Sequence, residues 1–483
     1  MHSADRILAV LAIGALWVAA TLAQAPVVSA AAVTYTEIAA GGAVTCALTS
    51  AGAVECWGDN QDGGLGDGTT ISSDGPVAVK GLTTGVMAVS SAGDHSCALT
   101  SAGAVECWGD NFYGQLGNGT TMDSDVPVAV SGLSSGVTVI STGVADTCAV
   151  VSGAAECWGL NGNGQMGDGT AVSSDIPVEV LGLSSGVTSI SIGWYHACAI
   201  VSGAAECWGS NEHGELGDGT TTGRLTPVGV TGLSQGVKAI SAGQWHTCAV
   251  EIVRSPVPAQ LAKCWGSNGN GQLGDGTTMD RATPVLVSGL SSGVSAISAG
   301  AVHTCAIVSG AAECWGDNSA GQLGDGTTTE MDTAGAVAGL SSGVSAISAD
   351  YDYTCAIVSG AAECWGDNTD GQLGTGDYTD HLAPAAVADP TTLKLSSTKK
   401  VAQGSSLKLQ ATVKSTAGTP IGTVDFYVDA VQVGTVALNH KGKATSTITV
   451  TQSEGTHQVW AVYEGSPPFG GSHNVPKKLT VTS

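Results

Sequence analysis

Apolar residues occur in short stretches separated by glycine-rich turns, and this alternation continues through most of the chain. Residues 295–300, 303–308 and 311–316 are three such stretches, and segments such as 284–287 supply a fourth. Valine, isoleucine, threonine and serine are abundant while helix-forming residues are few, which favours strands. The pattern therefore predicts an all-β protein built from short strands and tight turns.

The stretches repeat at a nearly fixed interval, which paired cysteines mark. The first cysteines of successive pairs are 50–51 residues apart, with one interval of 57 residues. A fixed period of this kind in a β-rich chain is typical of a β-propeller with one repeat per blade. The seven copies predict a seven-bladed β-propeller over residues 33–388. The expected blades are residues 33–85, 86–136, 137–186, 187–236, 237–293, 294–343 and 344–388.

The two cysteines of a repeat fall on neighbouring strands of one hairpin. A Ser-Gly loop places Cys148 opposite Cys157, and a Ser-Ala-Gly loop places Cys46 opposite Cys56. Directly opposed residues of antiparallel strands are close enough for a disulfide bond. Zinc is the alternative, but the Cys-x-x-Cys spacing of zinc sites does not occur in the sequence. The expected disulfides join Cys46 to Cys56, Cys97 to Cys107, Cys148 to Cys157, Cys198 to Cys207, Cys248 to Cys264, Cys305 to Cys314 and Cys355 to Cys364.

Residues 1–30 have the features of a secretory signal peptide. Arg6 precedes an apolar run over residues 7–23, and small residues at 28–30 offer a cleavage site. A membrane anchor is the alternative, since the run nearly reaches the length of a short membrane span. Cleavage is favoured because small residues crowd the end of the run and no basic stop follows. We therefore expect a secreted or cell-surface protein.

A motif recurs around the second cysteine of each repeat. It reads Cys-Trp-Gly-x-Asn-x-x-Gly-Gln-Leu-Gly at residues 314–324, and a Cys-Ala-Leu or similar stretch precedes it. These residues resemble the repeat of the regulator of chromosome condensation family across the seven copies. The resemblance implies a seven-bladed propeller, in agreement with the count of repeats. The nucleotide exchange on a nuclear GTPase that the family name implies is not expected here, because an exported acidic protein would meet neither that GTPase nor chromatin.

The sequence changes character at residues 389–390. The strands expected beyond this point are residues 407–413, 424–428, 431–438, 444–450, 459–463 and 479–481. The stretches at residues 422–427 and 461–465 resemble bacterial Ig-like repeats of surface and secreted proteins. Residues 389–483 are therefore expected to form an Ig-like β-sandwich, without a core disulfide because they contain no cysteine.

Charge separates the same two regions. The whole chain has a net charge of −25. Residues 33–388 hold 35 acidic and 6 basic residues, whereas residues 389–483 hold 5 acidic and 9 basic residues. Such a change of sign usually marks a domain boundary. The acidic excess argues against a nucleic-acid partner bound through its phosphates.

Positions at which the repeats differ are candidates for function. Four repeats carry a histidine two residues before the first cysteine, and we expect it to brace a loop rather than bind metal. These histidines are His95, His196, His246 and His303. Aromatic and acidic residues gather in the adjacent loops, and aromatic loop tips are typical of protein-binding surfaces. The candidate partner-binding residues are Asp94, Phe112, Tyr113, Trp194, Tyr195, Trp245, Tyr351, Asp352 and Tyr353.

These patterns favour a binding protein without catalytic activity. Neither Gly-x-Ser-x-Gly nor His-Glu-x-x-His occurs in the sequence. The acidic loops at residues 59–63 and 367–371 lack the ligand spacing of a calcium loop, so neither metal nor cofactor is expected. We expect a monomer that binds a protein or a cell-surface ligand. The alternatives are a carbohydrate-active enzyme with carboxylates at the propeller axis and a purely structural extracellular spacer.

Overall fold

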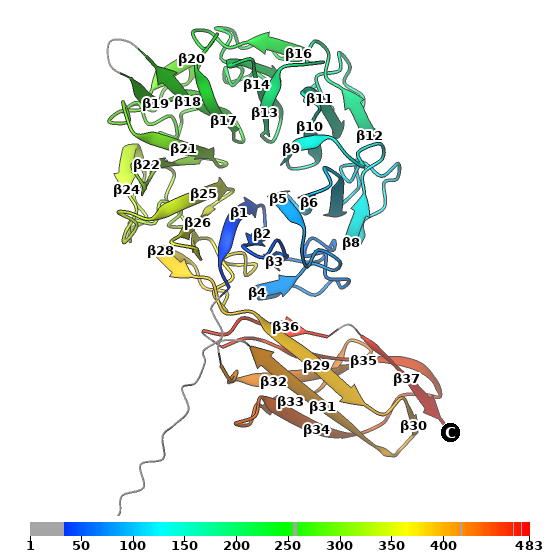
Figure 1. Ribbon diagram of the computed structural model, residues 1–483. Helices are drawn as coiled ribbons and strands as arrows, with labels where there is room; N and C mark the ends of the chain where they lie inside the picture. The colour runs from blue at the N-terminus through cyan, green and yellow to red at the C-terminus, as the bar shows by residue number, and fades with distance from the viewer. Residues whose placement is uncertain (1–32, 255–257, 416–417, 467, 475) are drawn as a thin grey trace, which may run out of the picture.

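The computed structural model describes residues 33–254, 258–415, 418–466, 468–474 and 476–483. Seven four-stranded antiparallel sheets surround a central axis, and two further sheets form a separate C-terminal domain (Figure 1). The predicted fold class, a seven-bladed propeller followed by an Ig-like sandwich, is therefore confirmed. The expected signal peptide lies outside the described residues. Within the described part of the chain, no helix is long and apolar enough to span a bilayer.

Each blade uses four consecutive strands, with the first nearest the axis (Figure 1). Blades 1 and 2 contain β1 (Tyr35–Gly41), β2 (Val44–Thr49), β3 (Val54–Gly58) and β4 (Ser73–Ala78), then β5 (Val86–Ala92), β6 (His95–Thr100), β7 (Val105–Gly109) and β8 (Ser124–Ala129). Blades 3 and 4 contain β9 (Val137–Thr142), β10 (Asp146–Val151), β11 (Ala154–Gly159) and β12 (Ser174–Glu179), then β13 (Val187–Ile192), β14 (His196–Val201), β15 (Ala204–Gly209) and β16 (Arg224–Gly229). Blade 5 contains β17 (Val237–Ala242), β18 (His246–Val253), β19 (Ala259–Gly266) and β20 (Arg281–Leu286). Blades 6 and 7 contain β21 (Val294–Ala299), β22 (His303–Val308), β23 (Ala311–Gly316) and β24 (Met331–Ala336), then β25 (Val344–Asp350), β26 (Tyr353–Val358), β27 (Ala361–Gly366) and β28 (His381–Ala386).

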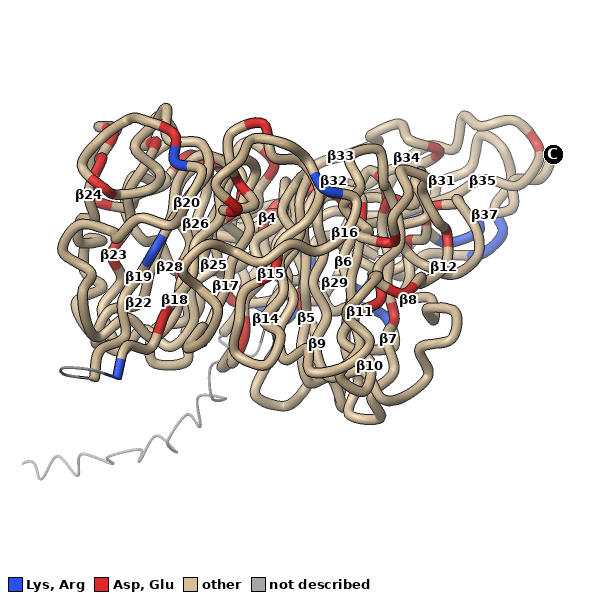
Figure 2. Tube along the Cα trace, turned by 90° about the horizontal axis from the view of Figure 1, so that it is seen from above, with Lys and Arg blue, Asp and Glu red and all other residues tan. Residues whose placement is uncertain are grey.

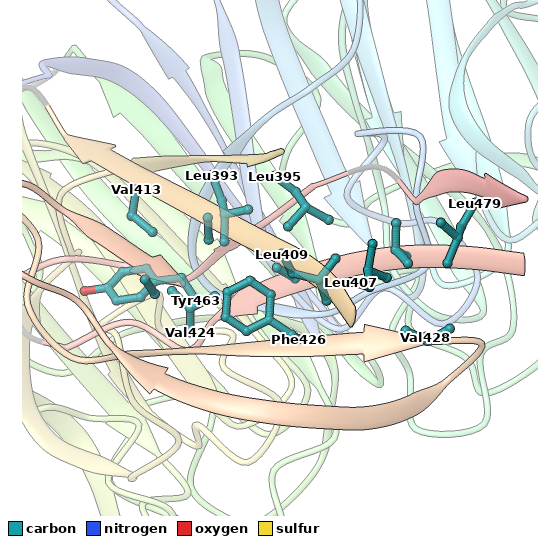
Figure 3. Packing of buried hydrophobic residues seen from close by; sticks show 14 of the residues in the cluster. Leu393, Leu395, Leu407, Leu409, Val413, Val424, Phe426, Val428, Tyr463 and Leu479 are labelled. Carbon is teal, nitrogen blue, oxygen red and sulfur yellow. The ribbon is translucent and has the colours of Figure 1, made fainter. Parts of the chain in front are cut away.

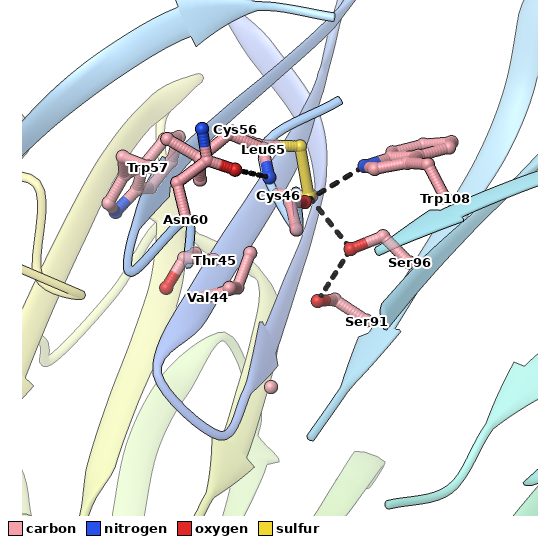
Figure 4. The surroundings of a disulfide bond; sticks show 12 residues. Val44, Thr45, Cys46, Cys56, Trp57, Asn60, Leu65, Ser91, Ser96 and Trp108 are labelled. Atoms are coloured by element: carbon pink, nitrogen blue, oxygen red, sulfur yellow. Dashed lines mark hydrogen bonds between the residues drawn. A yellow bond between two sulfur atoms is a disulfide. The ribbon is translucent and has the colours of Figure 1, made fainter. Parts of the chain in front are cut away.

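The central hairpin of each blade has the register predicted from its loop length. In blade 3 the paired residues include Cys148 with Cys157 and Val151 with Ala154. The intervening Ser152 and Gly153 have φ values of 52° and 86°, the two left-handed residues that a tight two-residue hairpin turn requires. All seven predicted disulfides form, with Cα–Cα distances of 4.0–4.1 Å. Figure 4 shows the Cys46–Cys56 bond between the two strands of its hairpin.

The tryptophan of the repeat motif binds each blade to the one before it. Its indole N–H donates to a backbone carbonyl of the preceding blade, as Trp208 does to Gln165 at 2.7 Å. The same bond joins blade 1 to blade 7, where Trp57 donates to the carbonyl of Gln372 at 2.9 Å. The last glycine of the motif lies directly on this ring, since a Cβ on Gly167 would be 2.7 Å from Trp208 Nε1. The motif is therefore explained by contacts between blades.

Side chains close the ring between the first and last blades, and every strand of each of these blades comes from its own repeat. The amide of Tyr35 donates to the carbonyl of Gly360 at 2.9 Å. Tyr353 is fully buried between the two blades, and its hydroxyl accepts a hydrogen bond from the Gly41 amide at 2.9 Å. The closure therefore depends on packing and on backbone and side-chain hydrogen bonds rather than on an exchanged strand.

The C-terminal domain is a sandwich of two sheets. One sheet has the order β29 (Thr391–Ser397), β31 (Ser406–Ser415), β34 (Lys443–Thr449). The other has the order β30 (Lys400–Ala402), β37 (Lys477–Thr482), β35 (Gly455–Tyr463), β32 (Thr423–Val428), β33 (Val431–Ala437), and β36 (Ser472–His473) pairs with β35. The alternate apolar side chains of both sheets face each other, and Phe426 and Leu409 are completely buried between them (Figure 3). All six expected strands are present.

The two domains touch along blade 1. The Gly471 amide donates to the Asp74 carboxylate at 2.8 Å, and His473 Nε2 lies 2.8 Å from Asp67 Oδ2. The backbones of Gly75 and Gly470 are so close that a Cβ on Gly75 would lie 2.4 Å from the Gly470 Cα. The sandwich is thus held against the outer strand of the first blade (Figure 1).

Candidate functional site

The two variable loops of each repeat meet at one end of the propeller. One loop joins the first and second strands of a blade, and the other joins the third and fourth strands. A backbone hydrogen bond links the two loops in blade 2, where the Asp110 amide donates to the Asp94 carbonyl at 3.0 Å. Ser210 and Tyr195 make the equivalent bond in blade 4 at 2.9 Å. We call this end of the propeller the loop face.

Aromatic side chains form a continuous row across the loop face. The row runs through Tyr351, Trp194, Tyr195, Trp245 and His213, and we call it the aromatic row. Its successive ring centroids are 4.5, 6.3, 4.6 and 5.6 Å apart. Tyr195 and Trp245 are stacked, and all five residues are only partly buried. Neighbouring blades therefore bring together loops that are about 50 residues apart in the chain, as the spacing of a propeller repeat requires.

Trp194 lies across the mouth of the axial channel. It belongs to blade 4, yet its ring contacts Tyr351 of blade 7. The channel below it has a volume of about 120 Å³ and is lined mainly by small residues of the seven first strands. Asp350 is the only carboxylate among the described residues that line it. Burial raises the pKa of Asp350 to about 6, although its carboxylate accepts the amides of Gly42 and Tyr351 at 3.0 and 2.8 Å.

Carboxylates crowd the other half of the loop face, over blades 1, 2 and 7. Desolvation and then the negative charges of nearby carboxylates raise the pKa of Asp94 to about 6. Those carboxylates belong to Asp62, Asp59, Asp110 and Asp370. The aromatic row and the carboxylates adjoin at Tyr351. Burial raises the pKa of Tyr351, and the nearby charges of Asp350 and Asp94 raise it further, to about 12. The loop face therefore combines aromatic surface with strong negative charge.

Phe112 and Tyr113 form a second, smaller aromatic pair on blade 2. Their rings meet edge to face with centroids 4.9 Å apart. Phe112 is 70% exposed and Tyr113 is 41% exposed. Asp110 holds the loop in place, since its carboxylate accepts the Phe112 amide at 3.1 Å. Two large apolar rings are thus displayed to solvent beside the carboxylate cluster.

The four histidines are buried and connect neighbouring blades. His95 Nε2 lies 2.9 Å from the Thr147 hydroxyl of the next blade, and His196, His246 and His303 repeat the contact at 2.8–2.9 Å. The threonine hydroxyl donates its own proton to a backbone carbonyl, as Thr147 does to Gln115 at 2.9 Å. The histidine therefore donates from Nε2, and its burial disfavours the charged ring. Burial lowers the pKa of His95 and His246 to about 3 and that of His196 and His303 to about 4.

One candidate partner-binding residue is wrong. Tyr353 has no exposed surface, because it occupies the histidine position and bonds blade 7 to blade 1. Asp94 and Asp352 lie on the loop face. Asp352 is half-buried, and burial and the charges of Asp317 and Asp367 raise its pKa.

Asp350 was not among the predicted site residues. The sequence does carry a signal for it, since Gly300 and its equivalents in most other blades stand at that position.

Family models match both parts of the chain. The regulator of chromosome condensation (RCC1) repeat matches residues 51–99, 102–150, 154–200, 204–250 and 264–307, and a second model of that repeat matches residues 35–63 and 88–115. Together the repeat models match more than half of the chain. The bacterial Ig-like domain (group 3) matches residues 393–482.

Curated relatives are similar over short stretches only. The chain is 38% identical over 98 residues to the E3 ubiquitin-protein ligase HERC2 of Homo sapiens, which covers 20% of this chain and 2% of that protein. It is 31% identical over 125 residues to the mitochondrial RCC1 domain-containing protein RUG3 of Arabidopsis thaliana, which covers 26% of this chain and 28% of that protein. The matched stretches are thus less than a third of either relative.

Solved structures resemble the propeller. Yeast RCC1 (Prp20), in a structure with Kap60, matches with a TM-score of 0.60 and 18% identity, covering 74% of this chain and 85% of that chain. Human WBSCR16 matches with a TM-score of 0.58 and 21% identity, covering 67% of this chain and 87% of that chain. At these identities the likeness establishes the fold.

Proposed function

The chain belongs to the regulator of chromosome condensation (RCC1) repeat family, and from that premise we propose that it is an exported propeller that binds a protein partner through the loop face and has no catalytic activity of its own. The aromatic row is the observation that carries this proposal. Binding energy at protein interfaces concentrates in a few aromatic anchors. Tyr195 and Trp245 are stacked and partly open to solvent, so a partner can cover them without rearranging the propeller.

The charge of the loop face defines the surface that the partner must offer. Burial raises the pKa of Asp94, and the negative charges of Asp62 and Asp110 raise it further, so these like charges oppose one another. A partner with a basic patch would relieve this repulsion, whereas an acidic partner would add to it. Complementary charge mainly raises the association rate, which falls as salt is added. We therefore propose a partner whose contact surface is positively charged around an apolar centre.

The axial channel supports binding rather than glycoside hydrolysis. Such hydrolysis commonly uses two carboxyl groups about 5–9.5 Å apart. Asp350 is the only carboxylate among the described residues that line the channel, and Trp194 covers its mouth. Neither feature favours a sugar-binding cleft at the axis, so the loop face is the stronger candidate.

The disulfides support export. Seven disulfides and a bacterial Ig-like domain indicate an oxidising compartment. We propose that residues 1–30 direct the chain there and that it acts as a monomer outside the cytoplasm. Nucleotide exchange, which the family name suggests, is proposed to be absent.

Capture experiments test the proposal. Immobilised protein is exposed to culture medium and to an envelope extract, with Trp245→Ala as the anchor variant and Met87→Ala as the control. Met87 is 63% exposed at the start of β5, at the opposite end of the blade from the loop face. The expected result is one partner held by the wild type and by Met87→Ala.

Trp245→Ala should weaken that complex by about 2 kcal/mol or more, which is roughly a 30-fold loss of affinity, with an unchanged melting temperature. Trp194→Ala is less informative because Trp194 also covers the axial channel. The aromatic row would be shown to support packing only by either of two results. One is equal capture by all variants, and the other is a lowered melting temperature as the sole effect of Trp245→Ala.

A further inference from the structure

A groove on the C-terminal domain is lined by lysines. It lies between β29, the edge strand of the smaller sheet, and β37 of the larger sheet, and it has a volume of about 640 Å³. Four of its eight lining residues are Lys394, Lys399, Lys477 and Lys478. The remaining lining residues are Leu395, Ser396, Ser397 and Thr480, so no acidic side chain lines it. We call this site the lysine groove.

The lysines of the groove have no counter-charge. All four are exposed, and none forms an ion pair with any residue that the structure describes. Lys477 Nζ donates to the Leu395 carbonyl at 2.6 Å, which places one ammonium group against the open edge of β29. Four like charges in one groove repel one another, and a bound anion would remove that repulsion.

The groove is conspicuous because the rest of the molecule is acidic. Residues 33–388 carry 35 acidic and 6 basic residues, whereas the C-terminal domain carries 9 lysines and 5 acidic residues. Figure 2 shows basic residues gathered beside β37 and acidic residues spread over the propeller. The protein is therefore strongly polar along the line joining its two domains. Near a negatively charged surface, it would turn its C-terminal domain toward that surface and its loop face would remain free.

We propose that the lysine groove binds a linear anionic polymer that carries phosphate or carboxylate groups at regular intervals. A groove between two strands accommodates a chain, whereas a flat anionic membrane, which lysines can also bind by charge alone, gains nothing from the depth of the groove. The single apolar lining residue, Leu395, is buried. No aromatic ring lines the groove, so the stacking that single-stranded nucleic acids use is missing from its described walls. Lysine ammonium groups act as point charges and do not require the paired geometry that arginine recognises.

Binding measurements on the full exported protein test this proposal. The probes are soluble polyphosphate, poly-glutamate and vesicles that contain phosphatidylglycerol. The groove variant combines Lys394→Gln, Lys399→Gln, Lys477→Gln and Lys478→Gln. The matched control combines Lys80→Gln, Lys238→Gln, Arg254→Gln and Lys441→Gln, which removes the same charge from exposed residues outside the groove.

The wild type and the control should bind at least one of the two polymers, with affinity falling about 50-fold between about 50 and 200 mM salt if four contacts form. The groove variant should lose at least about tenfold in affinity and most of the salt dependence. Binding of polyphosphate alone assigns phosphate as the recognised group, and binding of poly-glutamate alone assigns carboxylate. Three results would overturn the proposal: an equal loss of affinity in both variants, tighter binding to vesicles than to polymers, or no binding by the wild type. These outcomes are independent of the loop face, which both variants leave intact.

Discussion

The phenolic oxygen of Tyr353 in blade 7 lies 2.9 Å from the hydroxyl of Thr45 in blade 1, which is 308 residues earlier in the chain. The same oxygen accepts the Gly41 amide at 2.9 Å. Four other junctions hold a histidine and a threonine in these two places. Tyrosine is longer than histidine and reaches the backbone of blade 1 as well as its threonine. The contact joins the two ends of the propeller, where continuity of the chain does not help.

Tyr353→Phe should therefore destabilise the propeller. The substitution leaves the buried Gly41 amide without its acceptor, and an unsatisfied buried donor costs about 1–3 kcal/mol. Tyr353→His should lose less, because histidine bonds to threonine at four other junctions. Urea unfolding measures both variants against Tyr427→Phe, a partly exposed tyrosine of the sandwich that should change stability by less than about 0.5 kcal/mol. A Tyr353→Phe protein as stable as the wild type would refute this account of ring closure.

The buried histidines should make the propeller sensitive to acid. Burial, and then the charges of His196 and His303, lower the pKa of His246 to about 3, whereas a histidine in an unfolded chain titrates near 6.5. Between these values the unfolded chain binds the extra proton, so stability is complete above about pH 6.5 and declines as the pH falls. Each such histidine should remove roughly 2 kcal/mol between pH 6.5 and pH 5.

Unfolding free energies of the wild type and His246→Gln at pH 5 and pH 7 measure this effect. The variant should show a shallower pH dependence, by about the contribution of one histidine. His457→Gln is the control, because hydrogen bonding to Asp429 raises the pKa of His457 and so favours the folded state in acid. Its removal should make the acid loss slightly steeper. Identical pH profiles for His246→Gln and the wild type would contradict the neutral, buried state of these rings.

The junction between blades 3 and 4 lacks the histidine–threonine bond. Asp146 replaces the histidine and Ala197 replaces the threonine, and the buried Asp146 Oδ1 has no hydrogen-bond partner. Burial raises the pKa of Asp146 well above its ordinary value, so the charged carboxylate is costly at this junction. The double variant Asp146→His with Ala197→Thr should therefore stabilise the propeller by about 1–3 kcal/mol at pH 7.

A double-mutant cycle separates this bond from other effects. The two substitutions together should stabilise more than the sum of the single ones, because neither alone completes the hydrogen bond. Asp146→Asn with Ala197→Thr is the matched control, since asparagine cannot place a ring nitrogen beside the threonine hydroxyl. Additive single effects would show that the bond contributes nothing at this junction.

The repeat determined how much of the fold could be predicted. Hairpin register follows from loop length and glycine position, so the pairing of Cys148 with Cys157 could be predicted from adjacent residues. Contacts between blades depend on residues about 50 positions apart, and only the recurrence of His95 and Thr147 in other repeats hints at them. The prediction that Tyr353 lies on the binding surface is wrong for the same reason. The variable position that it occupies faces the next blade rather than solvent.

The candidate site was predictable only in part. Aromatic residues in the loops of blades 4 and 5 indicated a surface, and Tyr195 and Trp245 stack on it. The contact of Trp194 with Tyr351 crosses the axis from blade 4 to blade 7. No local pattern encodes that contact, because it depends on the diameter of the closed ring. The lysine groove likewise combines two strands that are about 80 residues apart in the chain.

The contact between the domains should be separable without unfolding either domain. A Cβ at position 75 would lie 2.4 Å from the Gly470 Cα, and the backbone at both glycines leaves no room for it. Gly75 does not have a positive φ, so alanine fits the local backbone of β4 and the clash acts only on the neighbouring domain. Gly75→Ala should therefore displace the sandwich and break the Gly471–Asp74 hydrogen bond and the His473–Asp67 pair.

Small-angle scattering and limited proteolysis measure the displacement. Gly75→Ala should increase the radius of gyration and expose the chain near residues 388–390 to protease, while the circular dichroism spectrum stays that of the wild type. Gly229→Ala is the control, because Gly229 also lies in the outer strand of a blade and a Cβ there meets no atom within 4 Å. Both the His473–Asp67 contact and the Gly471–Asp74 hydrogen bond end on blade 1, so release of the sandwich should also lower the unfolding temperature of the propeller. A compact, protease-resistant Gly75→Ala protein would show that the interface shifts to accept the methyl group and that its close packing does not hold the domains together.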